Sequence, residues 1–250
     1  MRTKIFYIII TIGLVSFLNS CTDYLEIEPT DRQTTENFYK TRDDAFSALM
    51  GIYKPLTYQG WANWQDLGAT LDIMSDDCHK GGGNFADGGG WGPISIFKAT
   101  PSASQCADLW KKAYDGISRA NLLLNKFDEI TFSTKEVIDA KNFKAEALFL
   151  RAHYHLEAVR LFENIPLLIE PVDANSWRDV KQTDVHATYS QIAKDMLDAI
   201  PDLAVEFNDA NKAVFVVDDG LSSVVPGLAA FKLIDMANAI IEVITEVFIF

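Results

Sequence analysis

Residues 137–162 read VIDAKNFKAEALFLRAHYHLEAVRLF. Apolar side chains recur along this stretch at the three- and four-residue intervals of one helix face. The members of that face are Val137, Ala140, Phe143, Ala147, Leu150, Tyr154, Ala158, Leu161 and Phe162. Ser133 with Glu136 forms a capping box before the stretch, and Asn164-Ile165-Pro166 ends it. Small alanines on the face allow another helix to approach closely, so the stretch favours an all-α fold.

The sequence before this stretch supplies a second long helix. Its inner stripe consists of Leu109, Trp110, Ala113, Tyr114, Ile117, Ala120, Asn121 and Leu124. We expect Ser104 to cap its start. Long helices joined by short turns predict packed helical hairpins. The pair at 105–127 and 135–163 has the size of a tetratricopeptide-like unit, although its match to that repeat's signature is loose.

Two shorter helices complete the predicted α-helical hairpins. Thr41 with Asp44 is a capping pair before an amphipathic stretch that Pro55 ends or bends. Residues 188–200 form a last amphipathic helix, closed by Pro201. Polar side chains on the long helices are expected to serve the fold. Trp110, Tyr114 and Asn121 are predicted to take part in core packing and interhelical hydrogen bonds, and Arg119 and Arg151 to bind neighbouring carboxylates or carbonyls.

The first twenty residues have the pattern of a secretion signal. Arg2 and Lys4 give a positive start, and residues 5–17 form an apolar run too short to span a membrane comfortably. Cys21 follows small and polar residues, as in the lipobox of bacterial lipoproteins. We therefore expect residues 1–20 to be removed and Cys21 to be acylated; an ordinary signal with a chance cysteine is the alternative.

Charge and cysteine content limit the partners. The chain carries a formal net charge of -13, and removal of Arg2 and Lys4 with the signal would make it more negative. Such acidity argues against nucleic acid and against anionic lipid surfaces. Cys78 and Cys106 could form a disulfide in an oxidising compartment or remain as two free, half-buried thiols.

The chain resembles the SusD/RagB family of outer-membrane lipoproteins of Bacteroidetes. The motifs that carry the resemblance are, in order, Cys21-x2-Tyr-Leu-Glu-Ile-Glu-Pro, Glu36-Asn-Phe-Tyr, Ala48-x3-Ile-Tyr, Ser75-Asp-Asp, Leu109-Trp-x3-Tyr-x2-Ile-x-Arg-Ala-Asn, Ala145-Glu-Ala-x-Phe-Leu-Arg-Ala, Ile165-Pro-Leu and Tyr189-x2-Ile-x2-Asp-x3-Ala-Ile-Pro. The resemblance rests on their order and spacing behind the lipobox.

The resemblance implies an all-α, tetratricopeptide-containing protein that binds glycans, such as starch, or sometimes other nutrients at the cell surface. It also implies a partner, a TonB-dependent transporter of the SusC type, and a lipid anchor in the outer membrane. Residues 21–212 follow the family pattern, whereas residues 213–250 form an apolar string that departs from it. We interpret this tail as the mark of a truncated or frame-disrupted chain; a genuine short variant is the alternative.

A glycine-rich segment between residues 60 and 104 is the expected ligand site. Long loops with their own character are often functional, and glycines let the backbone approach a ligand. Aromatic rings can face the C–H side of a sugar while polar side chains bind its hydroxyls. The candidates, with Phe85 as a further loop aromatic, are Trp91, Trp61, Trp64, Asp76, Asp77, Asn84 and Asp87. The alternative is that the tryptophans pack against the helical core and the glycines only give flexibility.

We expect neither catalysis, nor a cofactor, nor a metal. Adjacent Asp76 and Asp77 rarely flank one bond from opposite sides, which glycoside hydrolysis requires. A metal site built from Cys78, His79, His153 and His155 is disfavoured because the two helical histidines, two residues apart, point in different directions. A non-catalytic interaction module, or a truncated fragment without function, remains the other interpretation.

Overall fold

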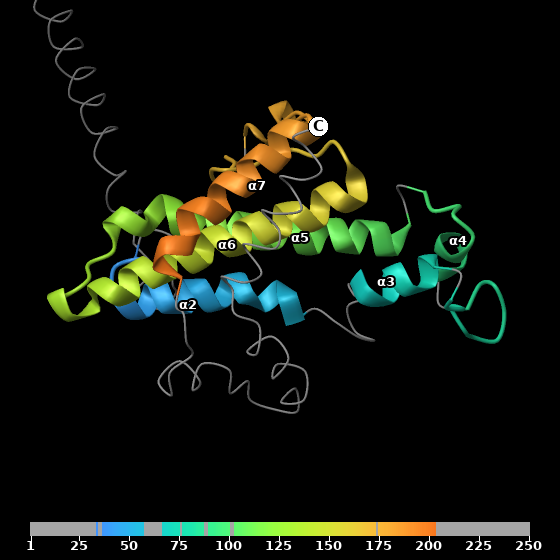
Figure 1. The fold of residues 1–250 in the computed structure, drawn as a ribbon, viewed down its shortest axis with the longest axis horizontal. Helices are drawn as coiled ribbons and strands as arrows, with labels where there is room; N and C mark the ends of the chain where they lie inside the picture. Colours follow the sequence, from blue (N-terminus) through green and yellow to red (C-terminus); the bar gives the residue numbers. More distant parts are fainter. Residues whose placement is uncertain are drawn as a thin grey trace, which may run out of the picture. The chain divides into compact units, whose positions relative to one another are not determined.

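The computed structural model describes residue 34 and residues 37–57, 67–75, 77–87, 90–100, 103–173 and 175–203 (Figure 1). The chain divides into two units, Met1–Phe38 and Tyr39–Phe250, and all the helices named below belong to the second. The predicted signal segment, Cys21 and the apolar tail lie outside the described residues. Within the described ranges the chain is helical and contains no β-strand, which confirms the all-α class.

The α-helices are α2 (Arg42–Tyr53), α3 (Leu67–Met74), α4 (Trp91–Ser95), α5 (Ser104–Lys126), α6 (Val137–Phe162) and α7 (Val185–Ala199). Short 3-10 turns lie beside them: η1 (Lys54–Thr57), η2 (Phe127–Glu129), η3 (Thr134–Glu136), η4 (Trp177–Asp179) and η5 (Ile200–Asp202). Helix α6 contacts α5, α7 and α2, and α2 also packs on α5 (Figure 1). The helices α5 and α6 form the predicted tetratricopeptide-like hairpin. Among the described helices, none is both long and apolar enough to cross a bilayer.

Two predicted capping boxes are present. The Thr41 N–H donates to Asp44 Oδ2 at 2.9 Å and the Asp44 N–H donates back to Thr41 Oγ1 at 3.3 Å. Ser133 and Glu136 form the second box, which begins the 3-10 turn η3 rather than α6 itself. These caps satisfy backbone N–H groups that have no partner inside the helix, and so fix where each helix begins.

The predicted cap at the start of α5 is wrong. Ala103 occupies the N-cap position without a side-chain hydrogen bond, and Ser104 is the first helical residue. The Ser104 hydroxyl instead donates to Gln105 Oε1 at 2.9 Å. The last helix also begins earlier than predicted, because the Asp184 carboxylate accepts from two backbone N–H groups and caps α7.

The C-terminal end of α2 is held by side chains from the long hairpin. Tyr154 of α6, which is fully buried, donates its hydroxyl to the Ile52 carbonyl at 2.6 Å. Arg119 of α5 donates to the Gly51 carbonyl at 2.8 Å and also pairs with the Asp115 carboxylate. Carbonyls at a helix end have no partner within the helix, so these bonds satisfy α2 and bind it to both long helices.

Tyr114 and Asn121 of α5 bond to the extended segment after α6, in addition to the predicted interhelical bond that Asn121 accepts from Arg151. Tyr114 donates its hydroxyl to the Pro166 carbonyl at 2.7 Å, and the Asn121 amide donates to the Leu168 carbonyl at 2.8 Å. Backbone groups of a non-helical segment need such partners when they are buried. The polar side chains of α5 therefore hold this segment against the hairpin.

A buried ion pair joins α6 to α7. Arg151 binds Asp195 through two parallel hydrogen bonds of 2.7 and 2.8 Å. The same guanidinium donates to Asn121 Oδ1 at 3.0 Å and to the Ile169 carbonyl at 2.9 Å, and Gln191 donates to Asp195 at 2.7 Å. The expectation that Arg151 binds carboxylates and carbonyls is confirmed, and the network connects both long helices, α7 and the extended segment.

Candidate ligand-binding site

The glycine-rich loop between α3 and α4 reverses direction at Gly81 and Gly82. Their φ angles are 71° and 84°, in the left-handed region that side chains with a Cβ rarely adopt. A Cβ on Gly82 would also collide with the Asp87 carboxylate. Glycine is therefore required here for a tight turn, and the turn brings residues 80 and 87 together.

Lys80 closes this loop from the inside. Its ammonium group donates to three backbone carbonyls: Gly81 at 3.2 Å, Asn84 at 2.9 Å and Asp87 at 2.8 Å. An ammonium has three donors, so these bonds match its capacity. The Lys80 ammonium group therefore holds the loop closed.

The predicted polar candidates Asn84 and Asp87 use their oxygens to shape the loop. Asn84 Oδ1 accepts from the N–H groups of Ala86 and Asp87 at 2.9 and 3.1 Å. Asp87 Oδ2 accepts from the Gly83 N–H at 2.7 Å. Both side chains are exposed at the surface. Because these hydrogen bonds lie within the loop, the loop has a defined shape before any ligand binds.

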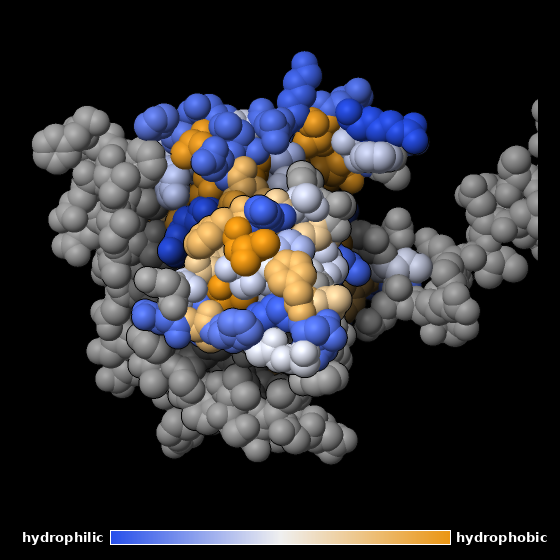
Figure 2. All heavy atoms as spheres, turned by 90° about the vertical axis from the view of Figure 1, so that its right-hand side faces the viewer, coloured by the Kyte–Doolittle hydropathy of each residue, from blue (hydrophilic) through white to orange (hydrophobic). Residues whose placement is uncertain are grey.

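A hollow of about 460 Å³ lies beside the loop. Its lining includes Cys78, His79, Lys80, Asn84, Phe85 and Ser95. Phe85 is 56% exposed, and a Cβ on Gly92 of α4 would collide with its carbonyl oxygen and come within 3.2 Å of its ring. Figure 2 shows apolar surface flanked by hydrophilic side chains on the side of the molecule where α3 and α4 lie. An exposed aromatic residue that lines a hollow together with polar side chains is an arrangement that suits sugar recognition.

The structure separates the predicted site residues. Trp91 begins α4 and is only 7% exposed, whereas Asp77 is exposed. An indole this buried has little surface for a ligand, so burial favours its packing role and our proposal rests on Phe85 instead. Trp61, Trp64 and Asp76 lie outside the described residues.

Lys80, His79 and Ser95 line the hollow but are not among the ligand-binding residues predicted from the sequence. Lys80 immediately precedes the glycine triplet at 81–83, and a cation beside accessible backbone carbonyls is the signal that could have identified its role. In the described ranges, no group of three or more His, Cys, Asp and Glu side chains is placed to hold a metal ion. Cys78 and Cys106 are both free thiols.

Comparison with known proteins gives the same fold and a family. Residues 23–214 match the SusD-like family described as "Starch-binding associating with outer membrane". SusD-like protein P25 of Formosa agariphila is 27% identical over 202 residues, which cover 77% of this chain and 37% of that protein. The chain thus spans little more than a third of this relative's length.

Solved structures show the same likeness. A structure named as a laminarin-binding SusD-like protein is 32% identical, with a TM-score of 0.62, and the match covers 70% of this chain and 37% of that one. Surface glycan-binding protein A from Bacteroides fluxus is 26% identical, with a TM-score of 0.59, over 70% of this chain and 38% of that one. These matches confirm the resemblance carried by the sequence motifs, and the chain belongs to the SusD-like family.

Proposed function

We propose that the chain binds a polysaccharide at the cell surface without cleaving it, and that the loop hollow is the binding site. The family's description as starch-binding supports a glycan ligand. The relative named for laminarin binding makes laminarin, a neutral glucan, the first ligand to test. The acidic chain, with its net charge of -13, fits a neutral glycan better than an acidic one.

Phe85 is the observation that carries the proposal. The residue is 56% exposed, and one edge of its ring lies close to Gly92 of α4. A ring held from one side offers its free surface to the C–H side of a sugar without losing further conformational entropy. Aromatic contacts of this kind contribute about 0.5–1.5 kcal/mol beyond area burial.

Polar groups for the sugar hydroxyls surround this ring. The Ser95 hydroxyl donates to the Gly92 carbonyl at 2.8 Å, which leaves its oxygen as an acceptor. His79 Nδ1 accepts from the Gly81 N–H at 3.0 Å, and its other ring nitrogen has no bond within the described residues. Asn84 uses its oxygen in the loop, so its amide nitrogen can donate to a hydroxyl.

Affinity gel electrophoresis with laminarin and a panel of other glycans is the test. We expect laminarin to retard the wild-type chain and Phe85→Ala to weaken binding by about fivefold, the loss expected of one aromatic contact. Trp177→Ala is the matched control, because Trp177 is equally exposed at 58% but does not line the hollow. Its retardation should equal that of wild type.

Circular dichroism would establish that each variant keeps its helix content. Equal retardation of wild type and a folded Phe85→Ala variant would place the glycan site elsewhere. Absence of retardation by every glycan would favour the interaction-module interpretation.

We further propose that Cys21 carries a lipid anchor in the outer membrane and that the chain delivers glycan to a SusC-type transporter. Cys21→Ala should move the protein from the membrane fraction to the soluble fraction, or leave the unprocessed precursor, because acyl chains supply the membrane affinity. Fractionation with labelled fatty acid checks this, and label on the Cys21→Ala protein would contradict it.

Detergent extracts of the same membranes, pulled down on the chain, should contain a TonB-dependent transporter; its absence would count against the delivery role.

A further inference from the structure

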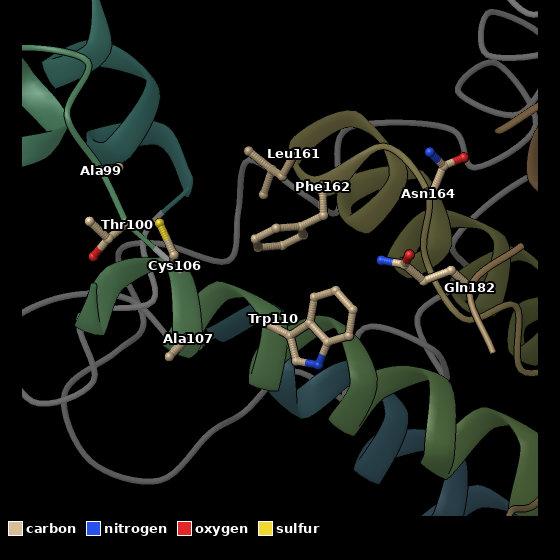
Figure 3. A pocket seen from close by; sticks show the side chains of 9 residues that line it. All are labelled: Ala99, Thr100, Cys106, Ala107, Trp110, Leu161, Phe162, Asn164 and Gln182. Atoms are coloured by element: carbon tan, nitrogen blue, oxygen red, sulfur yellow. The ribbon is translucent and has the colours of Figure 1, made fainter. Parts of the chain in front are cut away.

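A second hollow, of about 610 Å³, lies between the first half of α5 and the end of α6 (Figure 3). It is lined by side chains from α5, from the end of α6 and from the segments that follow α4 and α6. Its volume is within the range of small-ligand sites, roughly 300–1,000 Å³. Of the described loop residues, neither the aromatics Phe85 and Trp91 nor the glycines 81–83 and 90 are among its lining residues.

Two aromatic rings form the apolar part of this hollow. Trp110 and Phe162 meet edge to face, with ring centroids 5.1 Å apart and planes at 75°. Trp110 is also stacked on Tyr114 at 4.6 Å, so its orientation is fixed from a second side. Both lining rings are only partly buried, and Figure 3 shows them facing the hollow. They offer rigid apolar surface to a ligand.

Polar side chains complete the lining. Asn164 and Gln182 are exposed and make no hydrogen bond to any part of the chain that the structure describes. In Figure 3 the Gln182 amide extends toward the two rings, and Thr100 and Cys106 stand on the opposite side. An amide offers both donors and an acceptor, which suits a hydroxyl group that also does both.

The hollow is electrically neutral. No Asp, Glu, Lys, Arg or His is among the described residues that line it. The chain as a whole has 22 basic (Lys and Arg) and 35 acidic (Asp and Glu) residues. A neutral lining in an acidic protein disfavours phosphates, metal ions and acidic sugars, which need compensating charge when they leave water. Rings and amides without charges match an uncharged ligand with hydroxyl groups.

We propose that this hollow is a second binding site, for a neutral saccharide. It lies next to the loop hollow along the chain: Ser95 lines the first hollow and Ala99 lines the second. Four residues span at most roughly 14 Å, so one oligosaccharide could occupy both hollows. The proposal goes beyond the single site of the proposed function and concerns different residues.

The two free cysteines make the two sites separately measurable. Cys78 lines the loop hollow and Cys106 lines the second hollow. The full chain is treated with iodoacetamide, with and without a laminarin hexasaccharide, and alkylation of each cysteine is followed by peptide mass spectrometry. We expect the sugar to slow alkylation of Cys106 at least fivefold, whereas an oligosaccharide of uronic acids leaves its rate unchanged.

A variant without the two amides tests the cause of this protection. Asn164→Ala with Gln182→Ala should raise the sugar concentration needed for half-protection of Cys106 about tenfold, since two hydrogen bonds are lost. These side chains are exposed and bond to none of the described residues, so their removal should leave folding intact. Asn125→Ala is the control, because Asn125 is exposed on α5 and lies outside both linings.

The outcomes separate the two proposals. Protection of Cys78 without Cys106 supports the loop site and overturns the second one. Protection of Cys106 without Cys78 supports the second site and contradicts the loop site. Protection of Cys106 that is unchanged in the double variant, or equal protection by the uronic acid probe, would overturn the neutral-saccharide site. Absence of protection at both thiols rejects both.

Discussion

Replacing Arg151 by Met should lower the free energy of unfolding by about 3–5 kcal/mol, because it leaves the Asp195 carboxylate buried without its partner. The side chains are 8% and 1% exposed, and the two groups share a pair of parallel hydrogen bonds. The change also removes the donors for Asn121 and for the Ile169 carbonyl. The Asp195 side chain is only 1% exposed and keeps just the Gln191 amide as a donor, so most of its desolvation cost is not recovered.

Urea unfolding of the full chain, followed by circular dichroism, measures this loss. Lys194→Met is the matched control: its ion pair with Asp198 is at least half exposed on each side, so its loss should change the free energy of unfolding very little. The double variant Arg151→Met with Asp195→Leu should recover much of the stability, because it removes both charges. A loss below about 1 kcal/mol in Arg151→Met would show that Asp195 finds another partner or that water reaches it.

The helices could be predicted because their signals are local. Apolar spacing depends only on the helical repeat, and Thr41 with Asp44 forms its box within one turn. The predicted cap of α5 rests on the general suitability of serine for an N-cap. It is wrong because the Ser104 hydroxyl bonds to the neighbouring Gln105 side chain instead. Local preference alone does not decide between such competing partners.

The candidate site depends on burial and loop closure, which the sequence does not show. Trp91 and Phe85 are both aromatic residues in the glycine-rich region, but one is buried in α4 and the other exposed beside the hollow. The role of Lys80 depends on carbonyls up to seven residues away, which meet only when Gly81 and Gly82 adopt positive φ. The second hollow joins residues from 99 to 182, so it exists only after the helices have packed.

Gly116 is the clearest case of a residue whose reason lies in the partner helix. A glycine inside a helix costs about 1 kcal/mol relative to alanine, so one in the middle of α5 calls for a compensating contact. The structure supplies it: a Cβ on Gly116 would collide with the Tyr154 ring of α6. That ring is fully buried, and its hydroxyl is bound to the Ile52 carbonyl, so it has no room to move.

Gly116→Ala is therefore expected to destabilise the fold by about 2–3 kcal/mol, the cost of overpacking a rigid core. Gly51→Ala is the control for helix propensity, because a Cβ there meets only Arg119 Nη1 at an ordinary contact distance of 3.9 Å. That variant should instead stabilise α2 by about 0.5–1 kcal/mol. Urea unfolding of both variants compares the same chemical change with opposite expected signs. Stabilisation by Gly116→Ala would mean that α5 and α6 can separate at little cost, and the close helix approach would lose its role in the fold.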